Sequence, residues 1–274
     1  MERIGVHLSV VVMPIIVGLI AANSCWAFNV SQDTSLDKDY NEPFVITANN
    51  VTLECAGHTI RGNGNGNGLT LTNIQRATVR NCRITNFNRG VLLDGTTDSV
   101  FEGNEVNNNR GSGMCNAGAE GFHLQRGSNR NLFARNTVHD NSRDGFDLDF
   151  SDGNAFVLNF VEHNGTPECK DSSGISHAPV GNGIELDNCN DNDIIANLIN
   201  GNIHTGVSLD ASLRNVIDKN VINDNGFWGI RFAMRSNNNI VRYNELCGNK
   251  SPGPPNEFDI NTASNQVILN FVCP

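Results

Sequence analysis

The residues of this sequence best suited to chemistry are two pairs of acids set in a repeated pattern. Asp147 and Asp149 alternate with apolar residues, and Glu185 and Asp187 do the same 38 residues later. Strict alternation predicts short strands that bury one face, so both acids of each pair point away from the core. Grouped carboxylates of this kind can transfer protons or hold a cation.

A glycine opens each of these segments, and the same pattern recurs along the chain with a period of 22 to 24 residues, lengthened three times. Each copy has a glycine-led strand, a second apolar pair such as Val216-Ile217, and an asparagine two residues before a third apolar position, as in Asn220 and Ile222. Three short strands per period predict an all-β, single-stranded parallel β-helix of about nine rungs. Its asparagine column is expected to form a ladder of amide hydrogen bonds. The leading glycines are Gly68, Gly90, Gly121, Gly145, Gly183, Gly206 and Gly229.

Stacked rungs place equivalent positions in columns about 4.8 Å apart, and residues two apart on one strand lie about 6.6 Å apart. Like charges at these separations repel by roughly 1–4 kcal/mol per pair at a surface-like dielectric, which a bound cation or a protonated acid relieves. An Asp four residues after the glycine can instead cap a turn, but capping does not explain Asp147 and Glu185. Counted from the glycine, the +2 column holds His123, Asp147, Glu185, Ser208 and Arg231 in successive copies, and the +4 column holds Gln125, Asp149, Asp187 and Asp210.

Three insertions, at 111–120, 165–182 and 248–256, account for the lengthened periods. Each one immediately precedes a glycine-led strand, so all three are expected to leave the rod at one corner, beside the two columns. Loops along one face of a regular scaffold form a cleft, and the first two insertions flank the acidic rungs.

The segment Val51-Thr52-Leu53-Glu54-Cys55-Ala56-Gly57-His58-Thr59-Ile60 and copies such as Gly206-Val207-Ser208-Leu209-Asp210 resemble the pectin-lyase-like right-handed β-helix superfamily. The resemblance covers roughly Val45 to Pro274. It is greatest to the simple repeat proteins of the group, which include periplasmic copper-maturation proteins and uronan epimerases. It implies a right-handed helix and an enzyme that acts on acidic extracellular polysaccharide as a lyase or C5-epimerase, often with calcium.

On this resemblance, His123 or Arg231 would remove the proton beside a uronate carboxylate, and calcium on Asp147, Asp149, Glu185 and Asp187 would neutralise that carboxylate. The chain has Asp147-Leu148-Asp149 where uronan epimerases of this fold have Asp-Pro-His, and it lacks the motifs of pectate lyases and polygalacturonases. Two alternatives stay open. One is a glycoside hydrolase with Asp147 and Asp187 about 8 Å apart, an inverting separation. The other is a non-catalytic envelope protein that binds glycans or metal. Four other histidines are expected to be ordinary surface residues: His139, His163, His177 and His204.

The first 27 residues predict a secretory signal peptide, with an apolar run over 10–22 and small residues near Ala27. We expect residues 28–43 to form an entry or cap segment and residues 44–274 to form the β-helix domain. The cleaved protein would be secreted or periplasmic, monomeric and without stable membrane insertion. The formal net charge of -10 and the lack of basic clusters argue against nucleic acid as a partner.

Seven cysteines remain after signal removal, in a compartment where disulfides persist. Cys247 and Cys273 hold equivalent positions on successive rungs, and Cys55 and Cys82 nearly so, which predicts two rung-to-rung disulfides. The odd count leaves one thiol unassigned. The insertions could be joined by Cys115 with Cys169, or by Cys169 with Cys189.

Overall fold

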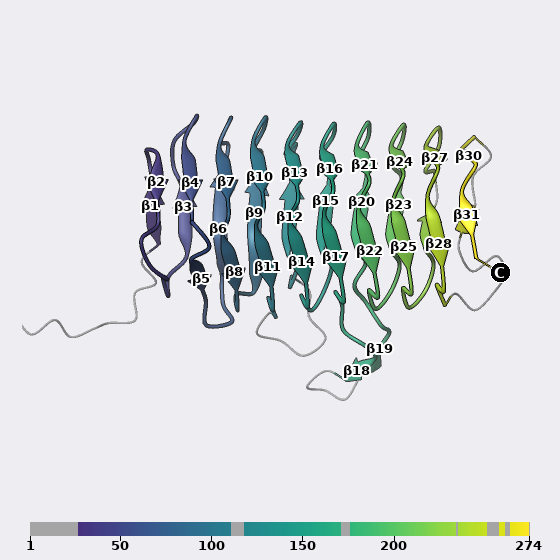
Figure 1. The fold of residues 1–274 in the computed structure, drawn as a ribbon, viewed down its shortest axis with the longest axis horizontal. Helices are drawn as coiled ribbons and strands as arrows, with labels where there is room; N and C mark the ends of the chain where they lie inside the picture. The colour runs from purple at the N-terminus through teal and green to yellow at the C-terminus, as the bar shows by residue number, and fades with distance from the viewer. Residues whose placement is uncertain are drawn as a thin grey trace, which may run out of the picture.

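The computed structural model describes residues 27–110, 118–170, 176–233, 235–250, 258–260 and 264–273. All regular elements in these ranges are β-strands, and the chain winds into a rod of stacked three-stranded rungs (Figure 1). The predicted all-β parallel β-helix is confirmed. The expected signal peptide, residues 1–27, lies outside the described residues except for Ala27.

Three parallel sheets run the length of the rod, and each rung contributes one strand to each sheet. Sheet A contains β1 (Phe28–Val30), β3 (Phe44–Ile46), β6 (Asn67–Thr72), β9 (Arg89–Asp94), β12 (Phe122–Gln125), β15 (Phe146–Asp149), β20 (Ile184–Asp187), β23 (Val207–Asp210), β26 (Ile230–Phe232) and β29 (Phe258–Ile260). Sheet B contains β2 (Thr34–Ser35), β4 (Thr52–Glu54), β7 (Thr78–Arg80), β10 (Val100–Glu102), β13 (Leu132–Ala134), β16 (Ala155–Val157), β21 (Asp193–Ile195), β24 (Val216–Asp218), β27 (Ile240–Arg242) and β30 (Gln266–Ile268). Sheet C contains β5 (Thr59–Arg61), β8 (Arg83–Thr85), β11 (Glu105–Asn107), β14 (Thr137–His139), β17 (Phe160–Glu162), β22 (Leu198–Asn200), β25 (Val221–Asn223), β28 (Glu245–Cys247) and β31 (Phe271–Val272).

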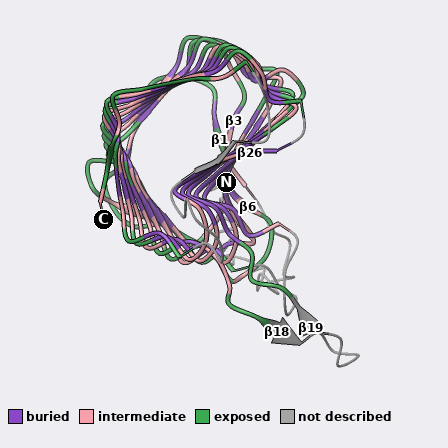
Figure 2. Ribbon diagram, turned by 90° about the vertical axis from the view of Figure 1, so that its right-hand side faces the viewer, coloured by how far each residue is buried: buried purple, intermediate pink, exposed green. Residues whose placement is uncertain are grey.

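One continuous apolar core fills the rod, around which the strands of successive rungs superimpose in the view along its axis (Figure 2). The residues one and three positions after each leading glycine point into this core, as the alternation predicted; Phe146 and Leu148 are fully buried. Aromatic rings continue the stacking inside the core. Phe133 stacks on the ring of Phe101 and on that of Phe156, each at 5.0 Å between centroids. Each rung therefore buries the apolar face of its neighbours, which a single rung could not do.

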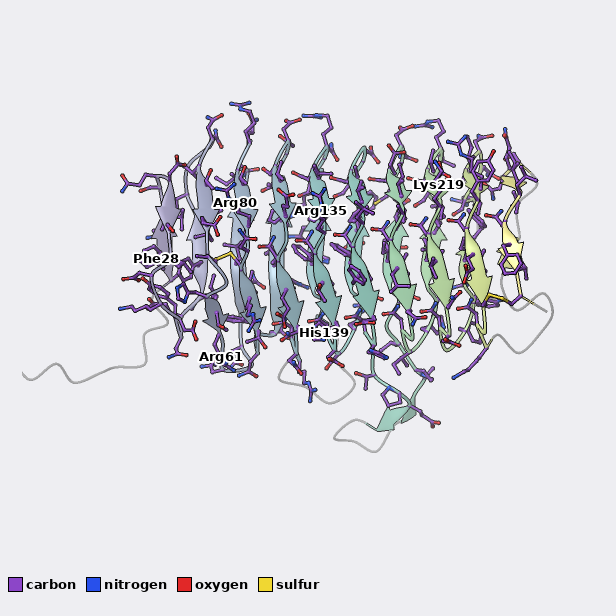
Figure 3. The ribbon with its side chains drawn as sticks, in the orientation of Figure 1. Phe28, Arg61, Arg80, Arg135, His139 and Lys219 are labelled. Carbon is purple, nitrogen blue, oxygen red and sulfur yellow. A yellow bond between two sulfur atoms is a disulfide. The ribbon has the colours of Figure 1, made fainter. Side chains whose placement is uncertain are left out.

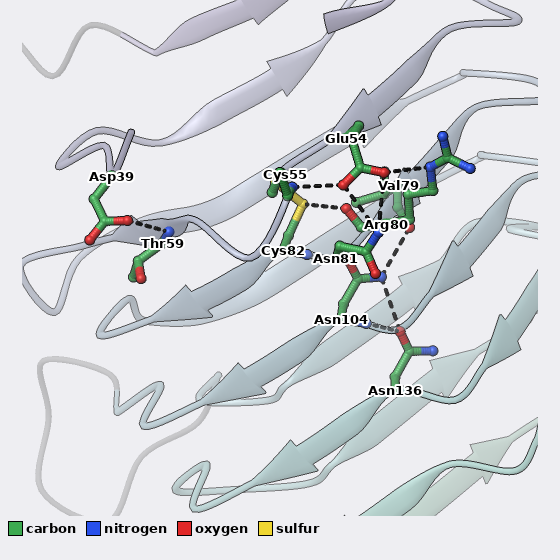
Figure 4. The surroundings of a disulfide bond; sticks show 11 residues. Asp39, Glu54, Cys55, Thr59, Val79, Arg80, Asn81, Cys82, Asn104 and Asn136 are labelled. Carbon is green, nitrogen blue, oxygen red and sulfur yellow. Dashed lines mark hydrogen bonds and ion pairs between the residues drawn. A yellow bond between two sulfur atoms is a disulfide. The ribbon is translucent and has the colours of Figure 1, made fainter. Parts of the chain in front are cut away.

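Asparagine ladders run along all three corners of the rod, where the sequence predicted one. In each ladder, the side-chain N–H group donates to the Oδ1 atom of the equivalent asparagine on the next rung. The link between Asn104 and Asn136, drawn in Figure 4, measures 3.0 Å. Buried amides would be costly without partners, so the ladders satisfy the backbone where the strands turn. Their described members are Asn104, Asn136, Asn159, Asn197, Asn220, Asn244 and Asn270; Asn131, Asn154, Asn192, Asn215, Asn239 and Asn265; and Asn109, Asn141, Asn164, Asn202, Asn225 and Asn249.

The leading glycines are required by space at the corner between sheets C and A. A Cβ atom on Gly145 would lie 2.6 Å from the Cγ1 atom of Val161 and 2.7 Å from the carbonyl oxygen of Gly183. The chain therefore bends inward at each glycine and passes close to the third strand of its own rung. This bend determines which side chains face each other in front of sheet A.

Both predicted rung-to-rung disulfides, Cys55–Cys82 and Cys247–Cys273, are present, and Figure 4 shows the first. The alternative pairing of Cys169 with Cys189 is wrong, because Cys189 is a buried free thiol. Its sulfur accepts a hydrogen bond from the backbone amide of Ser151 at 3.3 Å. The hydroxyl of Ser151 accepts in the same way from the backbone amide of Ser128, on the preceding rung. Cys189 thus replaces a serine in a structural column. Cys115 lies outside the described residues.

Ion pairs between successive rungs line the outside of the turns. Arg80 pairs with Glu54 at 2.6 Å and Arg135 pairs with Glu102 at 2.7 Å; Figure 3 labels both arginines. These side chains are largely exposed, so each pair adds little to stability.

The second insertion forms a small antiparallel hairpin of β18 (Cys169–Lys170) and β19 (Ser176–His177), which projects from the corner that leads into sheet A (Figures 1 and 2). Within the described ranges, no helix is long and apolar enough to cross a membrane.

Candidate functional site

The strand register of sheet A brings the predicted columns together. His123 pairs with Asp147, and Asp147 pairs with Glu185, in the +2 column. Asp149 and Asp187 are equally paired in the +4 column. Arg231 lies in the +2 column as well, but Ser208 on β23 separates it from Glu185.

A third column, which the sequence analysis missed, faces the +2 column. Its members immediately precede the leading glycines, and we call it the −1 column. Because the chain bends at each glycine, the −1 side chain of a rung lies beside the +2 side chain of the same rung. Glu120 thus lies near His123, and Asp144 lies near Asp147. One signal was available: the residue before the glycine is charged in three successive copies, Arg89, Glu120 and Asp144.

The −1 column also buries its partners. Alternation predicted that the +2 side chains point outward, and they do leave the core, but His123 is only 6% exposed and Asp147 only 5%. Glu120 and Asp144 are each 1% exposed. The expectation of a solvated acidic face is therefore wrong for the centre of the +2 column, and these charges act in a poorly hydrated environment.

His123 is held by two carboxylates of the next rung and by an amide of its own rung. Its Nδ1 atom lies 3.1 Å from Oδ2 of Asp147, and its Nε2 atom lies 3.2 Å from Oε1 of Gln125 and 3.7 Å from Oδ2 of Asp149. Burial by itself would lower the pKa of His123, but the hydrogen bond and the charge of Asp147 outweigh it and raise that pKa. The hydrogen bond to Asp147 thus fixes the orientation of a ring that can accept or donate a proton.

Two arginines balance part of the buried negative charge. Arg89 Nε lies 2.8 Å from Oε2 of Glu120, and Arg143 Nε lies 3.1 Å from Oδ2 of Asp144. Arg143 also approaches Glu120, at 3.5 Å. The second carboxylate oxygen of Asp144 accepts a hydrogen bond from the Asn182 amide at 2.6 Å. Neither Arg89 nor Arg143 was predicted from the sequence to be a site residue.

The neighbouring acids have raised pKa values. Burial, followed by the charges of Asp147 and Asp187, raises the pKa of Glu185 to about 7. Burial and the charge of Asp147 likewise raise the pKa of Asp187 to about 6. The pKa of Asp149 is raised by the same two causes, and that of Asp144 is raised well above its usual range by burial and by Glu185. The site therefore combines a histidine whose pKa is raised with an acid whose pKa is about 7.

Two groups of three side chains in the described residues bring potential metal ligands within 4.8 Å of one another. One group is Glu120, His123 and Asp147, and the other is Asp144, Asp147 and Glu185. Asp147 and Glu185 belong to the set of four predicted from sequence, whereas Asp144 comes from the −1 column. Oxygen-rich groups suit calcium, and a group with an imidazole suits a transition metal.

The fold and these columns define the class of protein, the pectin-lyase-like right-handed parallel β-helix proteins. A family model described as right handed beta helix region matches residues 29–161. A second, described as periplasmic copper-binding protein (NosD), matches residues 116–257, just over half of the chain. The chain belongs to this NosD family. A comparison with curated proteins found no match.

Solved structures confirm the fold. The periplasmic alginate epimerase AlgG is 17% identical with a TM-score of 0.62, and the match covers 85% of this chain and 63% of that protein. The A-module of the Azotobacter vinelandii mannuronan C-5 epimerase AlgE4 is 15% identical with a TM-score of 0.57, covering 89% and 75%. Pectate lyase Pel9A is 16% identical with a TM-score of 0.52, covering 88% and 67%. The chain thus spans about three fifths of the length of AlgG.

Proposed function

We propose that this protein acts on an acidic extracellular polysaccharide as a lyase or C5-epimerase. The observation that carries the proposal is the buried pair of His123 and Asp147, 3.1 Å apart, beside an acid whose pKa is about 7. Similarity to epimerases and lyases of uronate polymers supports it. Two disulfides indicate an oxidising compartment, and we propose that the protein works in the periplasm or outside the cell.

Both reactions begin with removal of the proton at C5 of a uronate, and the site supplies groups for that step. Neutral His123 accepts the proton, while Asp147 orients the ring and stabilises the imidazolium that forms. Protonated Glu185 then donates a proton. Delivery to the glycosidic oxygen at C4 breaks the chain and leaves a C4–C5 double bond. Delivery to the opposite face of C5 instead inverts the sugar.

The developing charge on the substrate carboxylate must be neutralised in a site that is itself acidic. Arg143 lies within the cluster and can contribute. We propose that a calcium ion held by Asp144, Asp147 and Glu185, whose ligand oxygens lie within 4.8 Å of one another, would be a second source of positive charge. Glu185 would then be ionised, and water rather than Glu185 would supply the proton. Asp149 and Asp187, the other two acids predicted as ligands, would then set the charge at the rim.

The test is turnover of alginate and polygalacturonate, with calcium or chelator, by the wild type and by His123→Ala and Asp147→Asn. A lyase produces unsaturated ends that absorb in the ultraviolet, and an epimerase incorporates deuterium at C5 from D2O. Both signals should fall by roughly 100-fold or more in the His123 variant. Reducing ends without ultraviolet absorbance would instead show a glycoside hydrolase. If all three signals are absent on both polymers, the enzymatic proposal is wrong.

A second candidate function is metal binding without catalysis, favoured by the group of Glu120, His123 and Asp147 and by the copper-binding description of the family. A ring nitrogen with two carboxylates suits a divalent transition metal. Copper titration of the metal-free protein, followed by its visible absorbance, tests this function. Binding that survives His123→Ala would show that the metal sits elsewhere.

A further inference from the structure

An aromatic and cationic cluster lies on the same face as the acidic site, towards the C-terminal end of the rod. Trp228 immediately precedes Gly229 and so belongs to the −1 column, as Asp144 does. Arg231 belongs to the +2 column, as Asp147 does. Both side chains are partly exposed. The rung of β26 therefore repeats the arrangement of the catalytic rung with different chemistry.

Ring contacts hold this cluster together. The guanidinium of Arg231 lies over the ring of Trp228, 5.4 Å from its centroid. The ring of Phe227 lies 3.9 Å from that of Trp228 and stacks on His204 at 4.8 Å. His204 was expected to be an ordinary surface residue, but it is partly buried within this cluster.

The cluster is continuous with the acidic site. Nδ1 of His204 lies 3.0 Å from Oδ1 of Asn182, which occupies the −1 column between Asp144 and Trp228. Three steps of the +2 column, from Asp147 through Glu185 and Ser208, lead to Arg231. At about 4.8 Å per rung, the two centres are roughly 14 Å apart along the axis. A sugar ring is about as long as one rung is high, so a chain lying along the columns would place a ring at each centre.

The side-chain chemistry selects an acidic sugar. An indole ring packs against the C–H face of a pyranose, and a guanidinium pairs with a carboxylate through two parallel hydrogen bonds. In the register of the +2 column, Arg231 stands between the uncharged Ser208 and Asp259, so it brings a positive charge to a column that is acidic at Asp147 and Glu185. A neutral sugar would use the indole ring alone.

We infer that Trp228 and Arg231 form a subsite for a uronate residue of the polysaccharide, about three sugar units from the unit that lies at His123 and Asp147. The subsite rests on the proposed function for its polysaccharide, and it adds the direction of the chain, which runs parallel to the rod axis. Trp228 contacts the sugar ring and Arg231 binds its carboxylate. Neither residue takes part in bond breaking.

Tryptophan fluorescence reports on this subsite directly. The sequence has two tryptophans, and Trp26 lies within the expected signal peptide; Trp26→Phe removes it from any uncleaved protein as well, so Trp228 is the single emitter. In that background we titrate His123→Ala, which cannot turn over, with hexamannuronate, hexagalacturonate and neutral cellohexaose. Either uronate oligomer should change the emission, and cellohexaose, which has no carboxylate for Arg231, should do so only at a much higher concentration. Arg231→Gln should raise the dissociation constant about tenfold or more, and Arg231→Lys, which keeps the charge but not the fork, should have an intermediate effect.

Kinetics separate the subsite from the proposed function. With an active parent, Trp228→Ala and Arg231→Gln should raise KM for the polymer and change kcat by less than about twofold, because Asp147 lies three rungs away and His123 four. An emission change without turnover would overturn the enzymatic proposal and keep the subsite. Turnover with unchanged KM in both variants and a silent Trp228 would overturn the subsite alone. No response and no turnover would overturn both. If Trp228→Ala fails to fold, the fluorescence titration of Arg231→Gln and the KM of Trp228→Leu decide.

Discussion

Replacing Glu185 by glutamine removes a carboxyl group that its surroundings keep from ionising. Its pKa rises from 4.5 to about 7 on folding, first through burial and then through Asp147 and Asp187. A folded-state pKa above the unfolded value means that the native protein binds the proton more tightly. Unfolding free energy therefore falls as pH rises from about 4.5 to 7, and the loss persists above that range. The pKa difference between the unfolded and folded states corresponds to a loss of about 3 kcal/mol in the free energy of unfolding above pH 7.

Glutamine has the shape of the protonated acid and cannot ionise. Glu185→Gln should therefore have little effect at pH 4.5 and should raise the unfolding free energy by as much as about 3 kcal/mol at pH 8. In a domain of this size, that is roughly 6–12 °C in melting temperature. Urea unfolding and thermal melts at both pH values, with chelator present to exclude metal binding, measure the effect.

The matched control is Glu162→Gln, an acid on β17 in sheet C and outside the acidic cluster. It should change stability by no more than about 0.5 kcal/mol at either pH. A Glu185→Gln protein that is destabilised at both pH values would show that the ionised carboxylate is needed for the fold. Equal stabilisation at pH 4.5 and pH 8 would show that the carboxyl is not perturbed by its neighbours.

Three further perturbations test the scaffold and the buried thiol. Asn197→Ala removes the amide that accepts from Asn159, at 2.9 Å from its side chain, and should cost roughly 2–4 kcal/mol in urea unfolding; a smaller loss would mean that water replaces the amide. Gly183→Ala sets a Cβ atom 2.5 Å from Cγ2 of Ile199 and should cost about 1–3 kcal/mol or more, so an unchanged melting temperature would contradict the close approach. Burial raises the pKa of Cys189 to about 12, so mass spectrometry should find its peptide alkylated at pH 8 only after unfolding; native labelling at the rate of a free thiol would refute that burial.

The fold could be predicted because every rung needs the same residue types at the same positions, and these recur at a regular spacing in the sequence. An asparagine such as Asn220 and a glycine such as Gly183 recur since each must match its equivalents above and below. Register followed from the same columns, and the pairing of Asp147 with Glu185 is as predicted. Periodicity determines which residues are neighbours along the rod.

Periodicity did not determine which residues face each other across a corner. Counting each strand from its glycine leaves out the residue before the glycine. The chain bends at that glycine, so Asp144, before the bend, lies beside Asp147, after it. The burial of His123 has the same origin. Alternation predicts which side of the sheet a side chain points to, but the residues that cover His123 on that side belong to the −1 column. The aromatic contacts of Trp228 and His204 arise in the same way, across rungs and across the bend.

The asparagine ladders give the rod a direction. In all three of them one side-chain N–H donates to the later rung and the carbonyl oxygen accepts from the earlier one, as at Asn197, whose other N–H donates to the backbone oxygen of Phe156. Strand dipoles in a sheet largely cancel, but these amide dipoles add, as peptide dipoles do in a helix. The rod is therefore electrically polar, with partial negative charge at its N-terminal end and partial positive charge at its C-terminal end. Stacking of two such rods end to end is complementary only head to tail, which is the geometry of filaments rather than of closed pairs.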